Sequence, residues 1–288
     1  MKIYLVGGAI RDELLGLPIN ERDWCVVGAK PEDLLSKGYR RVGKDFPVFL
    51  HPKTGEEYAL ARTEKKVAPG YDGFTFQTSP DVSIDEDLKR RDLTINAMAK
   101  DNKNNLIDPF GGMIDLRNKI LRHVSNAFKE DPVRILRTAK FAARFLSLKF
   151  EIDPSTIKIM SEMVEDGEIN SLIPDRIWKE TQEALSGENP HIFFEVLKKC
   201  NALQVLYPEI TIDKNQQQSK HTKIPSTHTL DVLKKSAKIS NVPEVRFATL
   251  VYRFLGSEKL DNNKALLDHK KENIIAINEI SRRLPIPS

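Results

Sequence analysis

The spacing of apolar residues changes along the chain, from short runs typical of strands to the longer period of helices. Near the N-terminus an apolar run over residues 3–6 ends at Gly7-Gly8, and residues 9–15 then carry apolar side chains at helical spacing up to Gly16. This order predicts a strand, a tight turn and a short helix. Three more elements are expected after it: a helix over residues 31–35, and strands over residues 46–51 and 57–62.

Residues 63–80 mix charged residues with Gly and Pro and have no usable period, which predicts a loop. The sequence leaves open whether this loop is the tip of a surface hairpin or a lid over a substrate. From residue 81 the pattern becomes helical, and the acidic start of a helix over residues 85–99 suits the helix dipole. The later elements are expected as a short strand at 106–112, helices from 130 and over 154–164, 174–185 and 190–200, a polar linker at 210–225, and helix again to about 284.

Strands followed by helices predict an α+β fold, and 288 residues allow one large domain or two to three small ones. The net charge of +4 permits a polyanionic partner without requiring one. Cys25 and Cys200 have no metal-type spacing, so we expect reduced thiols in a cytoplasmic protein. The start of the chain lacks a signal-peptide pattern, and no apolar run approaches the roughly twenty residues of a membrane span. We therefore expect no membrane partner.

The first thirty residues hold the candidate chemistry. Glycines between a strand and a helix let backbone N–H groups approach a phosphate, and Arg11 follows one turn into the helix. Glu21 and Asp23 are two residues apart, so on a strand both carboxylates face the same side. Two adjacent carboxylates repel each other unless a cation lies between them, and Mg²⁺ prefers such oxygen ligands. A phosphate cradle followed by this carboxylate pair predicts a nucleotidyl-transfer site.

The chain resembles the class II tRNA nucleotidyltransferases, the CCA-adding enzymes of bacteria, and in particular the gammaproteobacterial type. The resemblance runs from Met1 to about Glu209 and rests on motifs in a fixed order. These motifs are Leu5-Val6-Gly7-Gly8-Ala9-Ile10-Arg11-Asp12, Glu21-x-Asp23, Arg90-Arg91-Asp92-Leu93-Thr94-Ile95-Asn96-Ala97, Asp108-Pro109-Phe110-Gly111-Gly112 and Glu130-Asp131-Pro132-Val133-Arg134.

The resemblance implies a polymerase-β-like head, a small mixed sheet with helices, followed by an all-α neck and body. We expect the head over residues 1–118, the neck over 119–209, and a reduced body that contacts tRNA over 210–288. The implied activity is template-independent addition of CCA to the 3′ end of tRNA from CTP and ATP with Mg²⁺. No obligate protein partner is evident from the sequence.

The resemblance also implies roles for single residues. Glu21 and Asp23 are the catalytic metal ligands, and the residues implied in nucleotide binding are Gly8, Arg11, Arg91, Asp92, Asn96, Asp131, Arg134, Arg137 and Lys140. Asp131 and Arg134 face the base. Cytosine and adenine each present an amino donor beside a ring-nitrogen acceptor, which a carboxylate and a guanidinium match. Guanine and uracil present the reverse order, so they leave both side chains mismatched.

The sequence departs from the family pattern at several points. Glu21 stands where an aspartate is usual, and Lys140 stands where an arginine is usual, which replaces a bidentate contact by a point charge. Residues 245–250 resemble the start of a phosphohydrolase domain, but Tyr252-Arg253 follows where that domain has its His-Asp metal pair. We therefore expect no phosphatase activity.

Several alternatives share these motifs. Enzymes that add only CC or only A and bacterial poly(A) polymerases have the same head. The segment at residues 63–80, which supports the switch to A addition in this family, looks intact and favours full CCA addition. An RNA-binding protein without catalysis is an alternative of another class, and the combination of Glu21, Asp23 and Arg91 argues against it.

Overall fold

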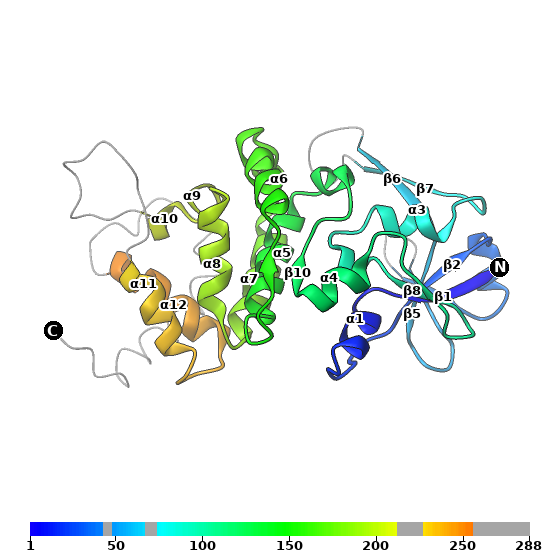
Figure 1. The fold of residues 1–288 in the computed structure, drawn as a ribbon, viewed down its shortest axis with the longest axis horizontal. Coiled ribbons are helices and arrows are strands. Elements are labelled where there is room, and N and C mark those ends of the chain that lie inside the picture. Colours follow the sequence, from blue (N-terminus) through cyan, green and yellow to red (C-terminus); the bar gives the residue numbers. More distant parts are fainter. Residues whose placement is uncertain (43–47, 67–73, 212–226, 256–288) are drawn as a thin grey trace. The chain divides into compact units, whose positions relative to one another are not determined.

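The computed structural model describes residues 1–42, 48–66, 74–211 and 227–255. The chain divides into two compact units, each treated separately below (Figure 1). Unit 1 contains residues 1–134 and 149–163, and unit 2 contains residues 135–148 and 164–288. Helix α5 (Val133–Arg144) therefore contributes to both units. The three-part division expected from the sequence stays a prediction.

Unit 1 is built on a seven-stranded sheet with the order β3-β4-β5-β2-β1-β8-β9. Strands β2 and β5 run parallel, whereas every other neighbouring pair in this sheet is antiparallel, so the sheet is mixed as predicted. The strands are β1 (Lys2–Val6), β2 (Asp23–Val27), β3 (Arg40–Val42), β4 (Val48–Leu50), β5 (Glu57–Leu60), β8 (Ala99–Lys100) and β9 (Leu106–Ile107).

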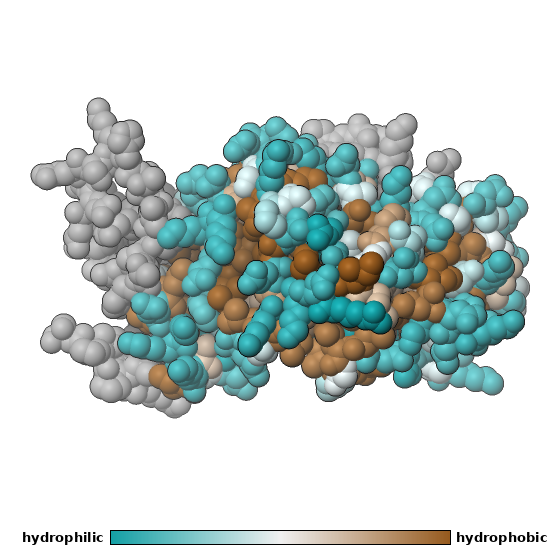
Figure 2. All heavy atoms as spheres, in the orientation of Figure 1, coloured by the Kyte–Doolittle hydropathy of each residue, from teal (hydrophilic) through white to brown (hydrophobic). Residues whose placement is uncertain are grey.

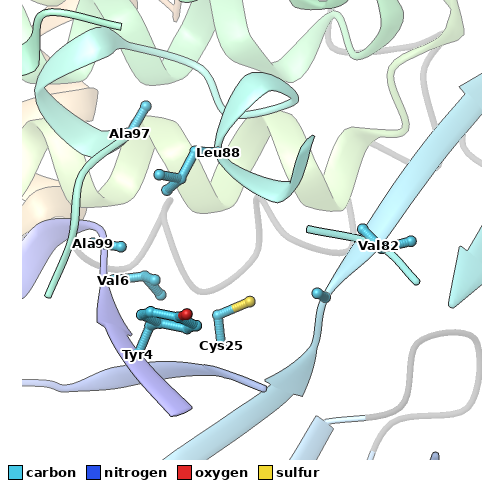
Figure 3. Close-up of a cluster of buried hydrophobic side chains, with 8 residues drawn as sticks. Tyr4, Val6, Cys25, Val82, Leu88, Ala97 and Ala99 are labelled. Carbon is cyan, nitrogen blue, oxygen red and sulfur yellow. The ribbon is translucent and has the colours of Figure 1, made fainter. Parts of the chain in front are cut away.

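Both faces of this sheet are covered. Successive side chains point to opposite faces, so Cys25 joins one core and Val26 the other. Figure 3 shows the first core, in which Cys25 lies among Tyr4, Val6 and Leu88. The second core contains Val26, Ala29, Leu34, Phe49, Tyr58 and Leu60. Burial on both sides explains why β1 and β2 appear in the sequence as nearly continuous apolar runs.

Short helices and turns complete unit 1. The α-helices are α1 (Gly8–Leu14), α2 (Pro31–Leu35), α3 (Ile84–Lys89), α4 (Gly112–Asn118) and the start of α6 (Pro154–Glu165). The 3-10 turns are η2 (Thr94–Asn96) and η3 (Asn126–Glu130). The predicted helices at 9–15, 31–35 and 154–164 are thereby confirmed.

Three expectations for unit 1 are wrong. Much of the predicted loop at 63–80 is a hairpin of β6 (Arg62–Lys66) and β7 (Phe74–Thr78), while residues 67–73 lie outside the described part. The helix expected over 85–99 ends at Lys89. The stretch expected to be helical from residue 119 contains two strands, β10 (Ile120–Leu121) and β11 (Glu151–Ile152), which pair in parallel.

The described part of unit 2 is helical. Its helices are α7 (Pro174–Ser186), α8 (Pro190–Lys199), α9 (Leu203–Leu206), α10 (Pro208–Thr211), α11 (Thr227–Ser236) and α12 (Pro243–Leu255), with the 3-10 turn η4 (Glu168–Ser171) before them. The predicted helices at 174–185 and 190–200 are confirmed. The expected linker falls largely on residues 212–226, which lie outside the described residues. The last expected helical stretch is confirmed over 227–255 by α11 and α12, and its remainder falls on 256–288, outside the described part.

Figure 2 shows hydrophilic residues spread over the visible face with hydrophobic ones between them, in keeping with a chain in which 30% of the residues are charged. None of the helices described is both long and apolar enough to cross a membrane.

Candidate active site

The turn between β1 and α1 is built around glycine. Gly7 has φ +74°, a conformation that side chains rarely adopt, and its N–H donates to the Met98 carbonyl at 3.2 Å. A Cβ atom at Gly7 would lie 2.9 Å from the Nη1 atom of Arg91. The absence of a side chain therefore lets the guanidinium of Arg91 rest against this turn.

Arg11 joins the turn to a segment 85 residues away. Its guanidinium donates to Asp12 at 2.8 and 2.9 Å and to Asn96 Oδ1 at 2.6 Å, and its side chain is buried. Asn96 Nδ2 in turn donates to Asp92 Oδ1 at 3.0 Å. The structure thus brings Arg11, Asp92 and Asn96, three of the predicted site residues, into one buried network beside Gly8.

Arg91 is held by a different carboxylate. Its Nη2 donates to Asp87 Oδ2 at 3.2 Å, and Arg90 donates to Asp87 Oδ1 at 2.7 Å. Burial raises the pKa of Asp87, but the positive charges of Arg90 and Arg91 outweigh it and hold the pKa below its usual range. Asp87 is therefore ionised at neutral pH.

The carboxylates of the predicted metal site lie at one end of β2. This strand begins at Asp23, so Glu21 precedes it, and the expectation that both residues share a strand is wrong. The strand begins at Asp23 because neither neighbouring strand extends past it. Val6, the last residue of β1, pairs with Asp23 before the chain turns at Gly7, and Glu57, the first residue of β5, also pairs with Asp23. Glu21 and Asp23 are both exposed.

Glu57 is paired with Asp23 across the parallel strands β2 and β5. Paired residues on neighbouring strands point to the same face, so two exposed carboxylates lie side by side where β2 and β5 begin. Carboxylate oxygens are the donors that Mg²⁺ prefers, so this donor set fits the ion. Among the described residues, no group of three or more His, Cys, Asp and Glu side chains is close enough together to hold a metal ion.

Asp131 and Arg134 flank the start of α5. Helix α5 begins at Val133, so the helix expected from residue 130 starts later and Asp131 precedes it. The Asp131 carboxylate accepts a hydrogen bond from the N–H of Val133 at 3.1 Å, and the Asp131 backbone carbonyl accepts one from the N–H of Arg134 at 3.1 Å. The Arg134 side chain is buried and donates to the Ala127 carbonyl at 2.5 Å.

Arg137 and Lys140 lie on the part of α5 that belongs to unit 2. Lys140 Nζ forms ion pairs at 2.5 Å with Glu180 and Glu183 of α7. The guanidinium of Arg137 lies over the ring of Phe141, 5.8 Å from its centroid. The part that these two residues take in the site stays a prediction.

Two residues of this region were not among those predicted for the site. Glu57 is the first residue of a strand predicted from the sequence, and only the pairing of β2 with β5 places it beside Asp23. Asp87 belongs to the acidic run 85–87, which indicates a helix start equally well. Only its burial, with 1% of the residue exposed, separates it from its neighbours.

Two family models match the chain: the poly A polymerase head domain over residues 3–122, and the probable RNA and SrmB-binding site of polymerase A over residues 149–213. Together they cover more than half of the 288 residues. The first match contains the whole network around Arg11 and both carboxylates at the start of β2.

Solved structures with the same fold include a tRNA nucleotidyltransferase complexed with a primer tRNA and an incoming ATP analogue, with TM-score 0.69 and 25% identity over 98% of this chain and 79% of the other. A Thermotoga maritima CCA-adding enzyme complexed with tRNA has TM-score 0.69 and 23% identity over 99% and 66%. A CCA-adding enzyme with CTP has TM-score 0.67 and 25% identity over 97% and 65%. The predicted polymerase-β-like head with a helical body is thereby confirmed.

Proposed function

Because the chain belongs to the nucleotidyltransferase family that carries the poly A polymerase head domain, we propose that it adds CCA to the 3′ end of tRNA from CTP and ATP and releases pyrophosphate. The observation that carries this proposal is the register that pairs Asp23 with Glu57 beside the glycine turn. Structures of similar fold contain tRNA with an ATP analogue, or CTP, which supports the choice of substrates.

In this proposal Asp23 and Glu21 hold divalent ions, and Glu57 is the carboxylate paired beside Asp23. When bound, Mg²⁺ activates the RNA 3′-hydroxyl and stabilises the negative charge of the leaving pyrophosphate. The carboxylates fix where the triphosphate lies relative to the end of the RNA. Glu21, which lies before the strand, reaches the ions with a longer side chain than the aspartate usual in this family.

In this proposal the glycine turn, Arg11 and Arg91 bind the triphosphate of the nucleotide. The absence of side chains at Gly7 and Gly8 lets the backbone approach the triphosphate, with Arg11 and Arg91 supplying positive charge. Asp92 and Asn96 keep Arg11 in place through the hydrogen bonds that join them. These side chains are fixed in advance, which lowers the cost of ordering them when the nucleotide binds.

Base selection is assigned to Asp131 and Arg134, followed along α5 by Arg137 and Lys140. A carboxylate and a guanidinium match the donor and acceptor edges of cytosine and adenine and mismatch guanine and uracil. Both side chains already make hydrogen bonds to the backbone: Asp131 accepts from the N–H of Val133 at the start of α5, and Arg134 donates to the Ala127 carbonyl in η3. In this proposal, part of these hydrogen bonds to the backbone is replaced by hydrogen bonds to the base when the nucleotide binds.

The test is the length of the product. Purified protein with Mg²⁺, CTP and ATP is expected to extend a tRNA lacking its 3′ end by three nucleotides, resolved on a sequencing gel, and EDTA is expected to abolish the extension. tRNAs ending before C, after CC and after CCA separate the alternatives. Products with only C, a single A added to a CC end, or a long A tail would each identify a rival enzyme, and binding without extension would identify an RNA-binding protein.

Asp23→Ala is expected to reduce transfer at least about 10³-fold while leaving tRNA affinity nearly unchanged, since removing a metal ligand removes the charge stabilisation that the reaction needs. Asp85→Ala is the matched control, because Asp85 is an exposed carboxylate of the same unit at the start of α3. Glu57→Gln is expected to have an intermediate effect. Full transfer by Asp23→Ala would contradict the assignment of the metal site.

A further inference from the structure

Asp87 is the most deeply buried carboxylate among the described residues of unit 1, with 1% of the residue exposed. It lies on α3, outside the residues proposed to bind metal or nucleotide. Its two carboxylate oxygens accept hydrogen bonds from different residues. Oδ1 accepts from Arg90 at 2.7 Å and from the N–H of Arg62, the first residue of β6, at 3.4 Å, while Oδ2 accepts from Arg91 at 3.2 Å.

Arg91 depends on this contact. Its Nε is buried and has no hydrogen-bond partner among the described residues, and its Nη1 points at Gly7, 2.9 Å from where a Cβ would be. Asp87 is the side chain in the described part of the chain to which Arg91 donates. A long side chain such as that of arginine has many rotamers of similar energy. The contact with Asp87 therefore decides which of them Arg91 adopts.

We propose that Asp87 is a positioning residue, which holds the guanidinium of Arg91 against the glycine turn so that it meets the incoming nucleotide already oriented. This inference rests on the proposed function, in which Arg91 contacts the nucleotide. The same carboxylate touches the first residue of the β6–β7 hairpin, so the position of Arg91 is also tied to the base of that hairpin.

The decisive variant is Asp87→Asn, which keeps the size of the side chain and removes its charge. If Asp87 acts by orienting Arg91, KM for CTP rises about tenfold while kcat changes less than about threefold, because a misplaced binding group weakens nucleotide binding before it affects the reacting atoms. Direct titration of the protein with CTP and Mg²⁺ is expected to show the same loss of affinity.

A double-mutant cycle separates positioning from a general structural role. In an Arg91→Ala background, Asp87→Asn is expected to change the affinity for CTP less than twofold, since the group that it positions is gone. Asp153→Asn is the matched control: Asp153 also binds a guanidinium of unit 1, that of Arg122 at 2.6 Å, but touches neither Arg91 nor Gly7. It is expected to lower the unfolding midpoint without raising KM.

Equal KM for the wild type and Asp87→Asn would overturn the inference while leaving the proposed function intact. Additive effects of Asp87→Asn and Arg91→Ala would also overturn it, because independent residues add. A wild type that neither binds CTP nor extends tRNA would overturn the inference together with the proposed function. If Asp87→Asn does not fold, Asp87→Glu retains the charge and displaces it by one methylene, and an unchanged KM for that variant would again overturn the inference.

Discussion

Gly111 and Gly112 are identical in the sequence but are required for different physical reasons. Gly111 has φ +73° and nothing within 4 Å of a Cβ atom, so its requirement is conformational. Gly112 has no positive φ, but a Cβ there would lie 2.3 Å from the Thr94 carbonyl oxygen and 2.9 Å from Met98 Cγ. The sequence predicts that a turn ends the strand at this pair, but it contains no signal that α4 packs directly on η2.

Gly112→Ala is expected to lower the free energy of unfolding by about 3 kcal/mol, because the added methyl group forces backbone apart rather than a flexible side chain. Gly111→Ala is the neighbouring control and is expected to cost about 1 kcal/mol, the strain of a left-handed backbone. Urea unfolding of both variants measures the difference. Equal losses would show that the close approach to Thr94 is not what limits this position.

At the scale of elements, the sequence predicted helices better than strands. The helices at 154–164, 174–185 and 190–200 follow from local spacing and from the proline that begins each. The helix expected over 85–99 ended early because its second half pairs with a distant segment: Thr94 N–H donates to the Arg122 carbonyl, and Val124 N–H donates to that of Asp92. Such bonds between residues about thirty apart leave no periodic pattern in either segment.

The same limit explains the β6–β7 hairpin. Its first strand, Arg62-Thr63-Glu64-Lys65-Lys66, is polar and charged and shows no alternation of apolar residues. Pairing with Phe74–Thr78 is what makes it a strand. A segment of this composition is interpreted as a loop unless its partner is known.

Arg246 connects three helices of unit 2. Its guanidinium is buried and donates to four backbone carbonyls, those of Leu185 and Gly187 at the end of α7 and those of Ala237 and Ser240 just after α11. These carbonyls lie at or just after the C-terminal ends of two helices, where the negative ends of the helix dipoles favour a cation. Burial lowers the pKa of Arg246, yet an arginine remains charged at neutral pH.

Arg246→Met is expected to lower the free energy of unfolding of unit 2 by about 3 kcal/mol, because it leaves buried carbonyls without donors. Arg246→Lys is expected to recover part of the loss, since an ammonium reaches fewer of the four oxygens. Lys179→Met on α7 removes an exposed positive charge and serves as the control, with a change within about 0.5 kcal/mol. Equal destabilisation by Arg246→Met and Lys179→Met would show that the hydrogen bonds of Arg246 to these four carbonyls do not stabilise unit 2.

At the scale of the whole molecule, the candidate site joins segments that local patterns cannot connect. Arg11 and Asn96 are 85 residues apart and share a hydrogen bond, and Asp23 and Glu57 meet only through strand pairing. The sequence placed Arg11, Asp92 and Asn96 in one site through the order of its motifs. It did not find Asp87, because a buried acidic residue and an exposed one look alike at a helix start.

Each unit contains a histidine whose pKa is lowered, mainly by burial: His123 in unit 1, near Asp153 and Arg122, and His191 in unit 2, near Glu195, Lys234 and Asp231. A folded-state pKa below the unfolded value of about 6.5 means that the unfolded chain binds more protons as the pH falls. Stability from these groups is therefore fully present above pH 6.5 and is lost as the pH falls towards the folded pKa.

The two tryptophans of the chain allow this loss to be measured separately, since Trp24 belongs to unit 1 and Trp178 to unit 2. In a Trp24→Phe background, where Trp178 fluorescence follows unit 2, His191→Gln is expected to flatten the decline of the urea midpoint between pH 6.5 and 5. In a Trp178→Phe background, where Trp24 reports on unit 1, His123→Gln is expected to do the same. If either histidine variant flattened both transitions equally, the assignment of one acid-sensitive group to each unit would be wrong.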